Sequence, residues 1–179
     1  MTTIPSLGQR KVVYKNPYQE IYQITANFGN FTKDYFVNDF GEKAGILMIK
    51  EGRILLVGQY RLLVNQLSWE IPVGKIDDNE TPESAAIRET LEETGLKCQN
   101  LKPLLTYQTG MDIVSTPIFI FYSDEITKEE EFIPSEKEVE AIKWVTLSEG
   151  IEMIFKGVMA DSFSIIALLT YQTMKSRLK

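Results

Sequence analysis

Three glutamates at helical spacing constrain this chain more than any other feature. Glu89, Glu92 and Glu93 stand at relative positions i, i+3 and i+4. If the segment is helical, all three side chains share one face of the helix. The sequence therefore predicts a helix with a concentrated negative charge on one side.

The start and stop signals of this helix are strong. Thr81 is a good N-cap, Pro82 falls at the first helical position, and Gly95 stands where a glycine ends a helix. At about 100° per residue, three other residues are expected to lie opposite Glu89 and Glu93 and to face the core. These are Ile87, Leu91 and Thr94.

Three carboxylates on one face repel one another, so they need open water or a cation around them. A cluster of oxygen ligands suits Mg²⁺ or Mn²⁺ better than a metal that prefers thiolate or imidazole. The alternative is a solvated acidic face on which Arg88 pairs with Glu92. Composition and helical spacing leave both interpretations open.

The spacing of the residues around the glutamates favours the metal site over the solvated acidic face. Residues 74–95 follow the pattern G-x5-E-x7-R-E-x-x-E-E-x-G, which resembles the signature of the Nudix hydrolases. Thr90 stands where that family usually has an aliphatic residue, which we interpret as a tolerated packing change. The resemblance implies an α/β fold, the Nudix α/β/α sandwich, with a mixed sheet and an appended N-terminal antiparallel sheet.

The same resemblance implies a metal site. In that family the loop before the helix and the glutamates bind divalent cations that bridge a diphosphate, and water is the nucleophile. Carried over to this chain, Glu89 and Glu93 are the principal ligands of Mg²⁺ or Mn²⁺, and Glu92 and the Val73 carbonyl assist. Two further residues are expected to orient the helix and the loop, namely Glu80 and Arg88.

A second motif precedes the helix. Gln59-Tyr60-Arg61 and the later Glu70–Lys75, EIPVGK, are similar to stretches of the ADP-ribose pyrophosphatase branch of the family. That resemblance implies that Arg61 and Glu70 contact the substrate. An arginine beside an acidic metal site is suited to bidentate anion contacts. The alternative for Arg61 is a surface ion pair.

The chain contains no histidine, so acid–base chemistry must fall to carboxylates or to a metal-bound hydroxide. Related enzymes take the base that activates water from a mobile loop just before a strand like AIKWVTL. Glu138 and Glu136 fall nearest that position, and Glu138 is preferred. With Glu93, they form the predicted catalytic set.

Residues 1–40 are expected to form an N-terminal unit and residues 41–179 the Nudix hydrolase domain. Residues 10–40 alternate β-branched and aromatic side chains and predict three strands. So small a meander is a poor fold alone. In the ADP-ribose pyrophosphatase branch such strands exchange between subunits, which implies a homodimer. The alternative is an edge sheet on a monomer.

The remaining elements are predicted by local pattern. Residues 44–50 and 53–61 predict core strands joined at Glu51-Gly52, a hairpin signal. Residues 101–107 and 117–122 predict two more strands, with a loop between them. The acidic run 124–140 predicts a solvated loop. Helices are expected from near Leu147 and over 162–175.

Composition excludes several classes of protein. With 179 residues the chain suits one sizeable core, and its net charge of −6 with scattered basic residues argues against a nucleic-acid polymer as partner. A single cysteine, Cys98, excludes an internal disulfide. The chain also lacks the roughly 18 consecutive apolar residues of a membrane helix and a signal-like N-terminus, so a cytoplasmic protein without membrane contact is expected.

The sequence thus predicts an enzyme, a Nudix pyrophosphohydrolase. The expected reaction is metal-dependent hydrolysis of the diphosphate of a nucleoside diphosphate sugar, ADP-ribose-like or other, giving a nucleoside monophosphate and a sugar phosphate. One alternative is a hydrolase of nucleoside triphosphates or dinucleotide polyphosphates. The other is a nucleotide-binding regulator that does not catalyse hydrolysis.

Overall fold

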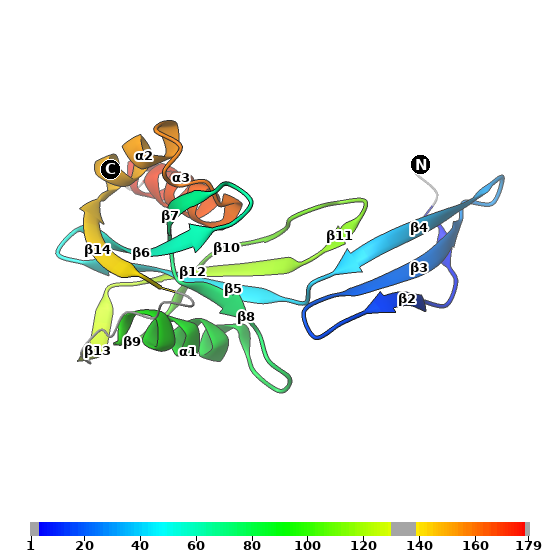
Figure 1. The fold of residues 1–179 in the computed structure, drawn as a ribbon, viewed down its shortest axis with the longest axis horizontal. Helices are drawn as coiled ribbons and strands as arrows, with labels where there is room; N and C mark the ends of the chain where they lie inside the picture. The colour runs from blue at the N-terminus through cyan, green and yellow to red at the C-terminus, as the bar shows by residue number, and fades with distance from the viewer. Residues whose placement is uncertain (1–3, 130–138, 178–179) are drawn as a thin grey trace. The chain divides into compact units, whose positions relative to one another are not determined.

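The computed structural model describes residues 4–129 and 139–177 (Figure 1). Its chain divides into two compact units. The first comprises residues 1–42 together with 107–117, and the second comprises residues 43–106 together with 118–179. The first unit thus includes a segment from the middle of the chain in addition to the N-terminal strands.

The first unit is a five-stranded sheet in the order β1-β3-β4-β11, with β2 paired to β3. The three strands predicted between residues 10 and 40 are present, and two further short strands join them. The pairing of β4 with β11 is parallel and joins residues far apart in sequence, Asn38 and Val114. The bounds are β1 Ser6–Leu7, β2 Lys11–Lys15, β3 Glu20–Asn27, β4 Thr32–Asp39 and β11 Val114–Ser115.

The second unit contains a seven-stranded mixed sheet in the order β10-β12-β5-β6-β14, with β7 paired to β6 and β8 paired to β5. The β12–β5 pair is parallel, whereas the β5–β6 and β6–β14 pairs are antiparallel. All the core strands predicted from sequence are found. Their bounds are β5 Lys43–Lys50, β6 Arg53–Arg61, β7 Gln66–Glu70, β8 Val73–Lys75, β10 Lys102–Gln108, β12 Pro117–Ser123 and β14 Ala141–Thr146.

The hairpin between β5 and β6 has the predicted turn. Glu51 and Gly52 both adopt positive φ, 51° and 74°, which is the backbone of a two-residue hairpin turn. The turn matters because β5 and β6 form the buried centre of the sheet. Among their apolar residues, Ile46, Leu47 and Leu55 are fully buried.

Three helices cover this sheet. Helix α1 (Pro82–Thr94) lies on one side of it, and α2 (Leu147–Phe155) and α3 (Ser162–Arg177) lie on the other (Figure 1). The three-layer α/β/α arrangement predicted from the resemblance is therefore confirmed. On the α1 side, Ala85 and Ala86 pack against β5 residues such as Ile46 and Met48 in one apolar cluster. Among the described residues, no helix is long and apolar enough to cross a membrane.

The acidic run 124–140 begins with a strand. Its first half forms β13 (Glu125–Glu129), which pairs with β9 (Leu96–Gln99) directly after α1. The prediction of a solvated loop is wrong there. Ile126 packs against the core cluster, and pairing with β9 satisfies the backbone groups that water would otherwise bind.

Candidate functional site

Helix α1 is capped as predicted, and two of its three predicted core residues belong to its core side, because Thr94 is buried and Ile87 packs against the core cluster. Thr81 caps its N-terminus through the Ser84 N–H, and Gly95 ends it at φ 72°. The buried residues are Ala85, Ala86, Thr90 and Thr94, so Glu93 lies within the sheet-facing side. The predicted separation of a core face from a carboxylate face is therefore wrong. Small side chains bring the helix close to the sheet and carry two of the glutamates inward.

Thr90 shows why the departure from the family pattern is tolerated. Its side chain is fully buried, but its hydroxyl donates to the Ala86 carbonyl at 2.8 Å. A buried threonine satisfies its polar atom in this way inside its own helix. The interpretation of Thr90 as a tolerated packing change agrees with this geometry.

Glu89 lies directly against the backbone of the loop before α1. A Cβ atom at Gly74 would stand 1.8 Å from the Glu89 carboxyl carbon, so only glycine leaves room for this carboxylate. Burial raises the pKa of Glu89 above its usual value, although Arg88 opposes the shift. Gly74 and Glu89, both part of the Nudix-like pattern over residues 74–95 (the Nudix box), thus form one structural unit.

Val73 precedes Gly74 in strand β8. Val73 pairs with Gly45 in the β5–β8 ladder, and the Ile46 N–H donates to the Pro72 carbonyl at 3.2 Å. In antiparallel ladders hydrogen-bonded and non-hydrogen-bonded pairs alternate. The Val73 carbonyl therefore points away from β5, which leaves it available as a ligand.

Glu93 is the most perturbed of the three glutamates. Its Oε1 accepts a hydrogen bond from the side-chain amide of Gln59 at 3.0 Å, whereas its Oε2 is buried with no partner among the described residues. Burial, and secondly the Glu89 carboxylate, raise the pKa of Glu93 to about 8. An unpaired buried carboxylate oxygen beside a second carboxylate is the environment that a cation stabilises.

Arg88 connects helix α1 to the segment that precedes it. Its guanidinium donates to Glu80 from Nε at 3.0 Å and from Nη2 at 2.9 Å, and to the Lys75 carbonyl at 2.9 Å. The same side chain reaches Glu89 at 2.8 Å and Glu92 at 3.3 Å. Its hydrogen bonds with Glu80 raise the pKa of Arg88 and lower that of Glu80. These contacts hold the loop on the helix.

The three box glutamates are not equivalent. Glu92 is largely exposed and its only ion-pair partner among the described residues is Arg88, as in the alternative of a solvated acidic face. Glu89 and Glu93 face inward instead. Within residues 4–129 and 139–177, no three acidic, cysteine or histidine side chains converge as a complete metal cluster. The residues nevertheless fit a divalent cation, because the free Glu93 Oε2 and the Gly74 cradle under Glu89 supply oxygen ligands and space.

Arg61 and Glu70 are joined by two hydrogen bonds. Arg61 donates from Nε to one Glu70 oxygen at 2.9 Å and from Nη2 to the other. Glu70 is buried, whereas the Arg61 side chain is half exposed. Arg61 therefore does form an ion pair, but this pair uses only the Nε and Nη2 side of its guanidinium. The N–H groups of Nη1 remain directed elsewhere, so the pair does not exclude an anion contact.

A cavity of about 230 Å³, lined by both apolar and charged residues, adjoins this ion pair. Burial and the Arg61 charge lower the pKa of Lys43, which lies at the start of β5. Burial, and next the Glu70 charge, raise the pKa of Asp161 to about 6. The cavity is lined by Lys43, Arg61, Leu63, Val64, Ser68, Glu70, Ala160, Asp161 and Phe163.

Sequence reasoning misses four residues of this region. It includes Gln59 only as part of the Gln-Tyr-Arg motif, and the contact of Gln59 with Glu93 depends on α1 packing over β6. The other three are Lys43, Asp161 and Phe163, which come from segments more than 100 residues apart. The only signal for Asp161 is local, since an aspartate precedes the predicted helix and caps it through the Ser164 N–H at 2.8 Å.

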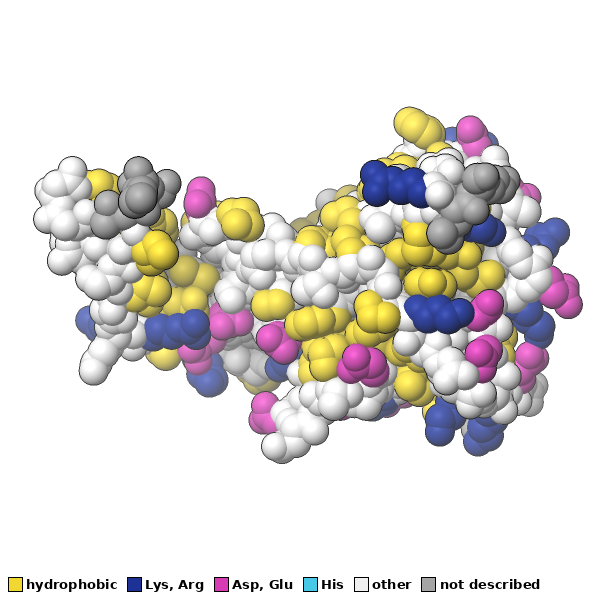
Figure 2. Space-filling view, turned by 180° about the vertical axis from the view of Figure 1, so that it is seen from behind, with side chains coloured by type: hydrophobic (Ala, Val, Ile, Leu, Met, Phe, Trp, Pro, Cys, Tyr) yellow, Lys and Arg dark blue, Asp and Glu magenta, His cyan; other side chains and the backbone are white. Residues whose placement is uncertain are grey.

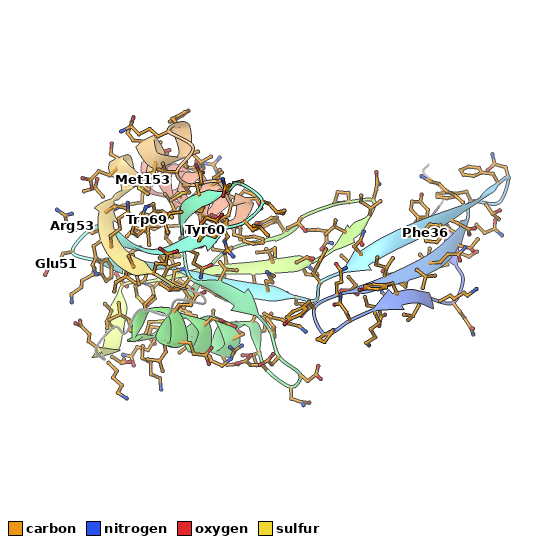
Figure 3. The ribbon with its side chains drawn as sticks, viewed as in Figure 1. Phe36, Glu51, Arg53, Tyr60, Trp69 and Met153 are labelled. Atoms are coloured by element: carbon orange, nitrogen blue, oxygen red, sulfur yellow. The ribbon has the colours of Figure 1, made fainter. Side chains whose placement is uncertain are left out.

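Glu136 and Glu138, the predicted bases, lie outside the described residues. Of the first described residues after them, Val139 is buried and Glu140 is bonded to the sheet. The Glu140 N–H donates to the Gly58 carbonyl at 2.9 Å, and β14 continues antiparallel along β6. The Lys143 ammonium lies 3.7 Å from the ring centroid of Trp69, which is labelled in Figure 3. The chain thus enters β14 beside Gln59.

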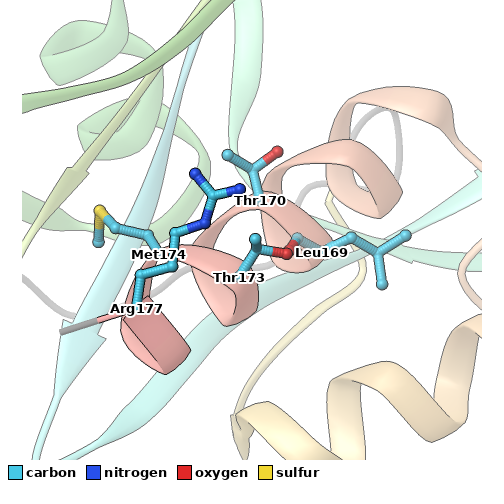
Figure 4. Close-up of a pocket in the computed structure, with 5 residues that line it drawn as sticks. All are labelled: Leu169, Thr170, Thr173, Met174 and Arg177. Carbon is cyan, nitrogen blue, oxygen red and sulfur yellow. The ribbon is translucent and has the colours of Figure 1, made fainter. Parts of the chain in front are cut away.

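A larger hollow, of about 440 Å³, lies along α3 (Figure 4). It carries none of the features of the glutamate site. Every residue that lines it comes from the one helix, and only one of them is charged. They are Leu169, Thr170, Thr173, Met174 and Arg177.

The fold and the box glutamates define a class of protein, and comparison with known proteins agrees. The NUDIX domain model matches residues 39–163, so the chain belongs to the NUDIX domain family. The predictions of the family and of a Nudix pyrophosphohydrolase are confirmed by this match and by the relatives that follow.

One relative is the CMP-5'-(N-acetyl-N-hydroxy-3-aminopropyl)phosphonate hydrolase of Streptomyces rubellomurinus, 32% identical over 144 residues, which are 79% of this chain and 68% of the relative. Another is an ADP-ribose pyrophosphatase of Bacillus subtilis, 28% identical over 152 residues, 84% of this chain and 82% of the relative. The crystal structure of an ADP compounds hydrolase has the same fold, with a TM-score of 0.83 over 99% of this chain and 97% of that one, at 16% identity.

Proposed function

We propose that this chain hydrolyses the diphosphate of a nucleoside diphosphate sugar in the presence of Mg²⁺ or Mn²⁺, giving a nucleoside monophosphate and a sugar phosphate. The observation that carries this proposal is the Glu89 carboxylate packed against Gly74, next to Glu93 with its buried oxygen that has no partner among the described residues. Two relatives, an ADP-ribose pyrophosphatase and a hydrolase of a CMP-linked phosphonate, support a nucleotide substrate.

Glu89, Glu93 and the Val73 carbonyl would hold the cation, and Glu92 would assist from the exposed side of α1. A bound divalent cation neutralises diphosphate charge and lowers the pKa of water. The protein supplies the position of these ligands: Gln59 orients Glu93, and Arg88 orients Glu89 while Glu80 holds Arg88.

Arg61 would bind a phosphate oxygen with the part of its guanidinium that Glu70 does not occupy. Glu70 is buried and accepts two hydrogen bonds from Arg61, so it fixes the plane of the guanidinium. A fixed guanidinium loses less conformational freedom when it binds an anion. Glu70 would then contribute to substrate binding indirectly, by orienting Arg61.

We assign the proton-abstracting role to Glu138, with Glu136 as the alternative. Glu140 is held next to Gly58, and two residues of chain reach at most about 7 Å. Gln59, the neighbour of Gly58, contacts Glu93. A carboxylate from this segment can therefore be placed near the water that the metal ligands surround. The absence of histidine from the chain supports a carboxylate base.

The N-terminal sheet supports a homodimer. It leaves large apolar side chains in water, among them Leu7, Val12 and Phe36, each more than half exposed. Figure 2 shows hydrophobic side chains on its surface, and Figure 3 shows Phe36 on β4. Exposed apolar patches of this kind mark interaction sites. A second copy of the chain is the partner that we propose, with a cytoplasmic location for the enzyme.

The test is a panel of substrates with purified protein and Mg²⁺. We expect nucleoside diphosphate sugars to give a nucleoside monophosphate and a sugar phosphate, and Glu93→Gln to abolish turnover without unfolding the protein. Glu83→Gln, on the exposed first turn of α1, is the matched control. Cleavage of triphosphates or dinucleotide polyphosphates alone would replace the proposed substrate class. Binding without any product would point to a regulator.

A further inference from the structure

The cavity beside Arg61 has no role in the steps described so far. We propose that it is a subsite for the hydroxyl-bearing sugar attached to the diphosphate, in which Asp161 accepts a hydrogen bond from a sugar hydroxyl and Phe163 packs on the sugar's C–H face. The inference rests on the proposed function, because it takes the substrate to be a nucleoside diphosphate sugar.

The position of the cavity favours this role. Gln59 and Arg61 are two residues apart on β6, so their side chains share one face of the sheet about 7 Å apart. Ser68, which lines the cavity, is opposite Gln59 in the β6–β7 register. One sheet face thus leads from Glu93, through Gln59, to the cavity. A group attached to a diphosphate at the glutamates would lie over it.

The size of the cavity restricts its occupant. Pockets for whole drug-sized ligands typically measure about 300–1,000 Å³. At about 230 Å³ this cavity takes one part of a nucleotide sugar and leaves the rest outside. The choice is therefore between the sugar and the nucleobase.

The lining favours the sugar. Small-molecule sites are usually apolar with a few placed polar groups, and this cavity fits that description, with Leu63, Val64, Ala160 and Phe163 as its apolar wall. Its polar groups therefore decide between the two occupants. Here two cations, Lys43 and Arg61, stand with two acids, Glu70 and Asp161, and a hydroxyl from Ser68 completes the polar set. A sugar presents several hydroxyls, each both donor and acceptor, and so can satisfy such a mixed set.

Asp161 has an unused hydrogen-bonding atom. Its Oδ2 accepts from the Ser164 N–H at 2.8 Å and so caps α3. Its Oδ1 is buried and has no hydrogen-bond partner within the described part of the chain. A buried acceptor without a donor loses its hydrogen bonds to water and gains none in return, and the loss is larger when the acceptor is charged. A sugar hydroxyl would remove this penalty on binding.

Phe163 provides the apolar wall. Its ring follows the cap of α3 and is half-buried at the cavity, with the Lys43 ammonium 5.5 Å from its centroid. An aromatic face next to hydrogen-bonding groups fits a sugar, which has both C–H faces and hydroxyl edges. Lys43 and Arg61 then remain for the phosphate that links the sugar to the rest of the substrate.

The experiment measures binding of ribose 5-phosphate, AMP and inorganic phosphate to the full-length protein in Mg²⁺, by calorimetry. Asp161→Asn is the main variant, because asparagine also caps helices and keeps α3 intact. Phe163→Leu tests the ring, and Ser162→Ala, the exposed residue between them, is the control. We expect Asp161→Asn to weaken ribose 5-phosphate binding about tenfold or more. Phosphate binding and melting temperature should not change.

Three outcomes would overturn the subsite: unchanged ribose 5-phosphate binding, an equal loss for inorganic phosphate, or a loss confined to AMP, which would mark a nucleobase pocket. Hydrolysis is measured separately on the wild-type protein. If the protein binds ribose 5-phosphate through Asp161 but cleaves no nucleoside diphosphate sugar, the proposed reaction fails and the subsite stands. If it cleaves them and Asp161→Asn binds normally, only the subsite fails.

Discussion

At the scale of single residues, Glu93 has the most unusual environment of the box glutamates. Its pKa of about 8 means that the folded protein without metal retains a proton that the unfolded chain releases near pH 4.5. Stability falls with rising pH wherever the folded state binds more protons than the unfolded one. The shift therefore opposes folding as the pH rises from about 4.5 to about 8.

We expect the melting temperature of the metal-free protein to fall between pH 5 and pH 8, and Glu93→Gln to flatten this dependence. For a chain of this length each kcal/mol corresponds to about 2–4 °C. Glu92→Gln is the control, because Glu92 is exposed. Calorimetry across this range checks the result, and parallel curves for wild type and Glu93→Gln would contradict the assigned environment.

Glu138 is the residue that we propose as the general base. General-base catalysis contributes about 10²–10⁴-fold, so Glu138→Gln should lower kcat by that order and leave KM nearly unchanged. Glu136→Gln is measured beside it, with exposed Glu140→Gln as control. If neither variant loses more than a few-fold, the base is a different group. A change in KM alone would make this segment a substrate clamp.

At the scale of elements, the site depends on how closely β8 approaches α1. The Glu89 carboxyl carbon occupies the position that a Cβ at Gly74 would take. Because the atom in conflict is the end of a flexible side chain, a larger residue displaces the carboxylate before it displaces the helix. Gly74 thus leaves the space between β8 and α1 to the Glu89 carboxylate.

Gly74→Ala should therefore weaken Mn²⁺ binding about tenfold or more, as is usual when groups that orient a ligand are lost. Overpacking costs about 1–3 kcal/mol, so the protein should stay folded. Titration of Mn²⁺ by electron paramagnetic resonance measures the affinity, with Gly8→Ala as control because a Cβ there makes ordinary contacts. Wild-type Mn²⁺ affinity in Gly74→Ala would show that Glu89 needs no such space.

At the scale of the whole molecule, the N-terminal sheet buries little of its own apolar surface. All five residues of β2 are exposed, and only Tyr22 and Ala26 are buried apolar residues of β1–β4. A sheet needs a covered face to be stable in water. A second copy of the chain would provide that cover.

Phe36→Asp should shift the protein from dimer to monomer, because a charge on an apolar interface is costly to bury. Sedimentation equilibrium gives the mass, and Lys97→Asp on exposed β9 controls for the added charge. A wild-type protein that is already monomeric would refute the dimer. A Phe36→Asp protein that remains dimeric would place the interface on another surface.

The sequence by itself determined the elements whose causes are local. Thr81 and Gly95 set the ends of α1, Glu51-Gly52 set the β5–β6 turn, and the spacing of the glutamates indicates the family. Each of these signals depends on residues close together in the chain. Capping, turn geometry and helical spacing depend on residues within one or two turns of the chain, so the sequence alone predicts them.

Only the tertiary structure decided what the glutamates face. The burial of Glu93 depends on small residues that bring α1 onto the sheet, and Gln59 reaches it from another element. The short strands β1, β11 and β13 form only through pairing with distant segments. Asp161 and Arg61 are 100 residues apart in the chain and line the same cavity for the same reason. Packing and register join residues by distance in space, which local sequence patterns do not encode.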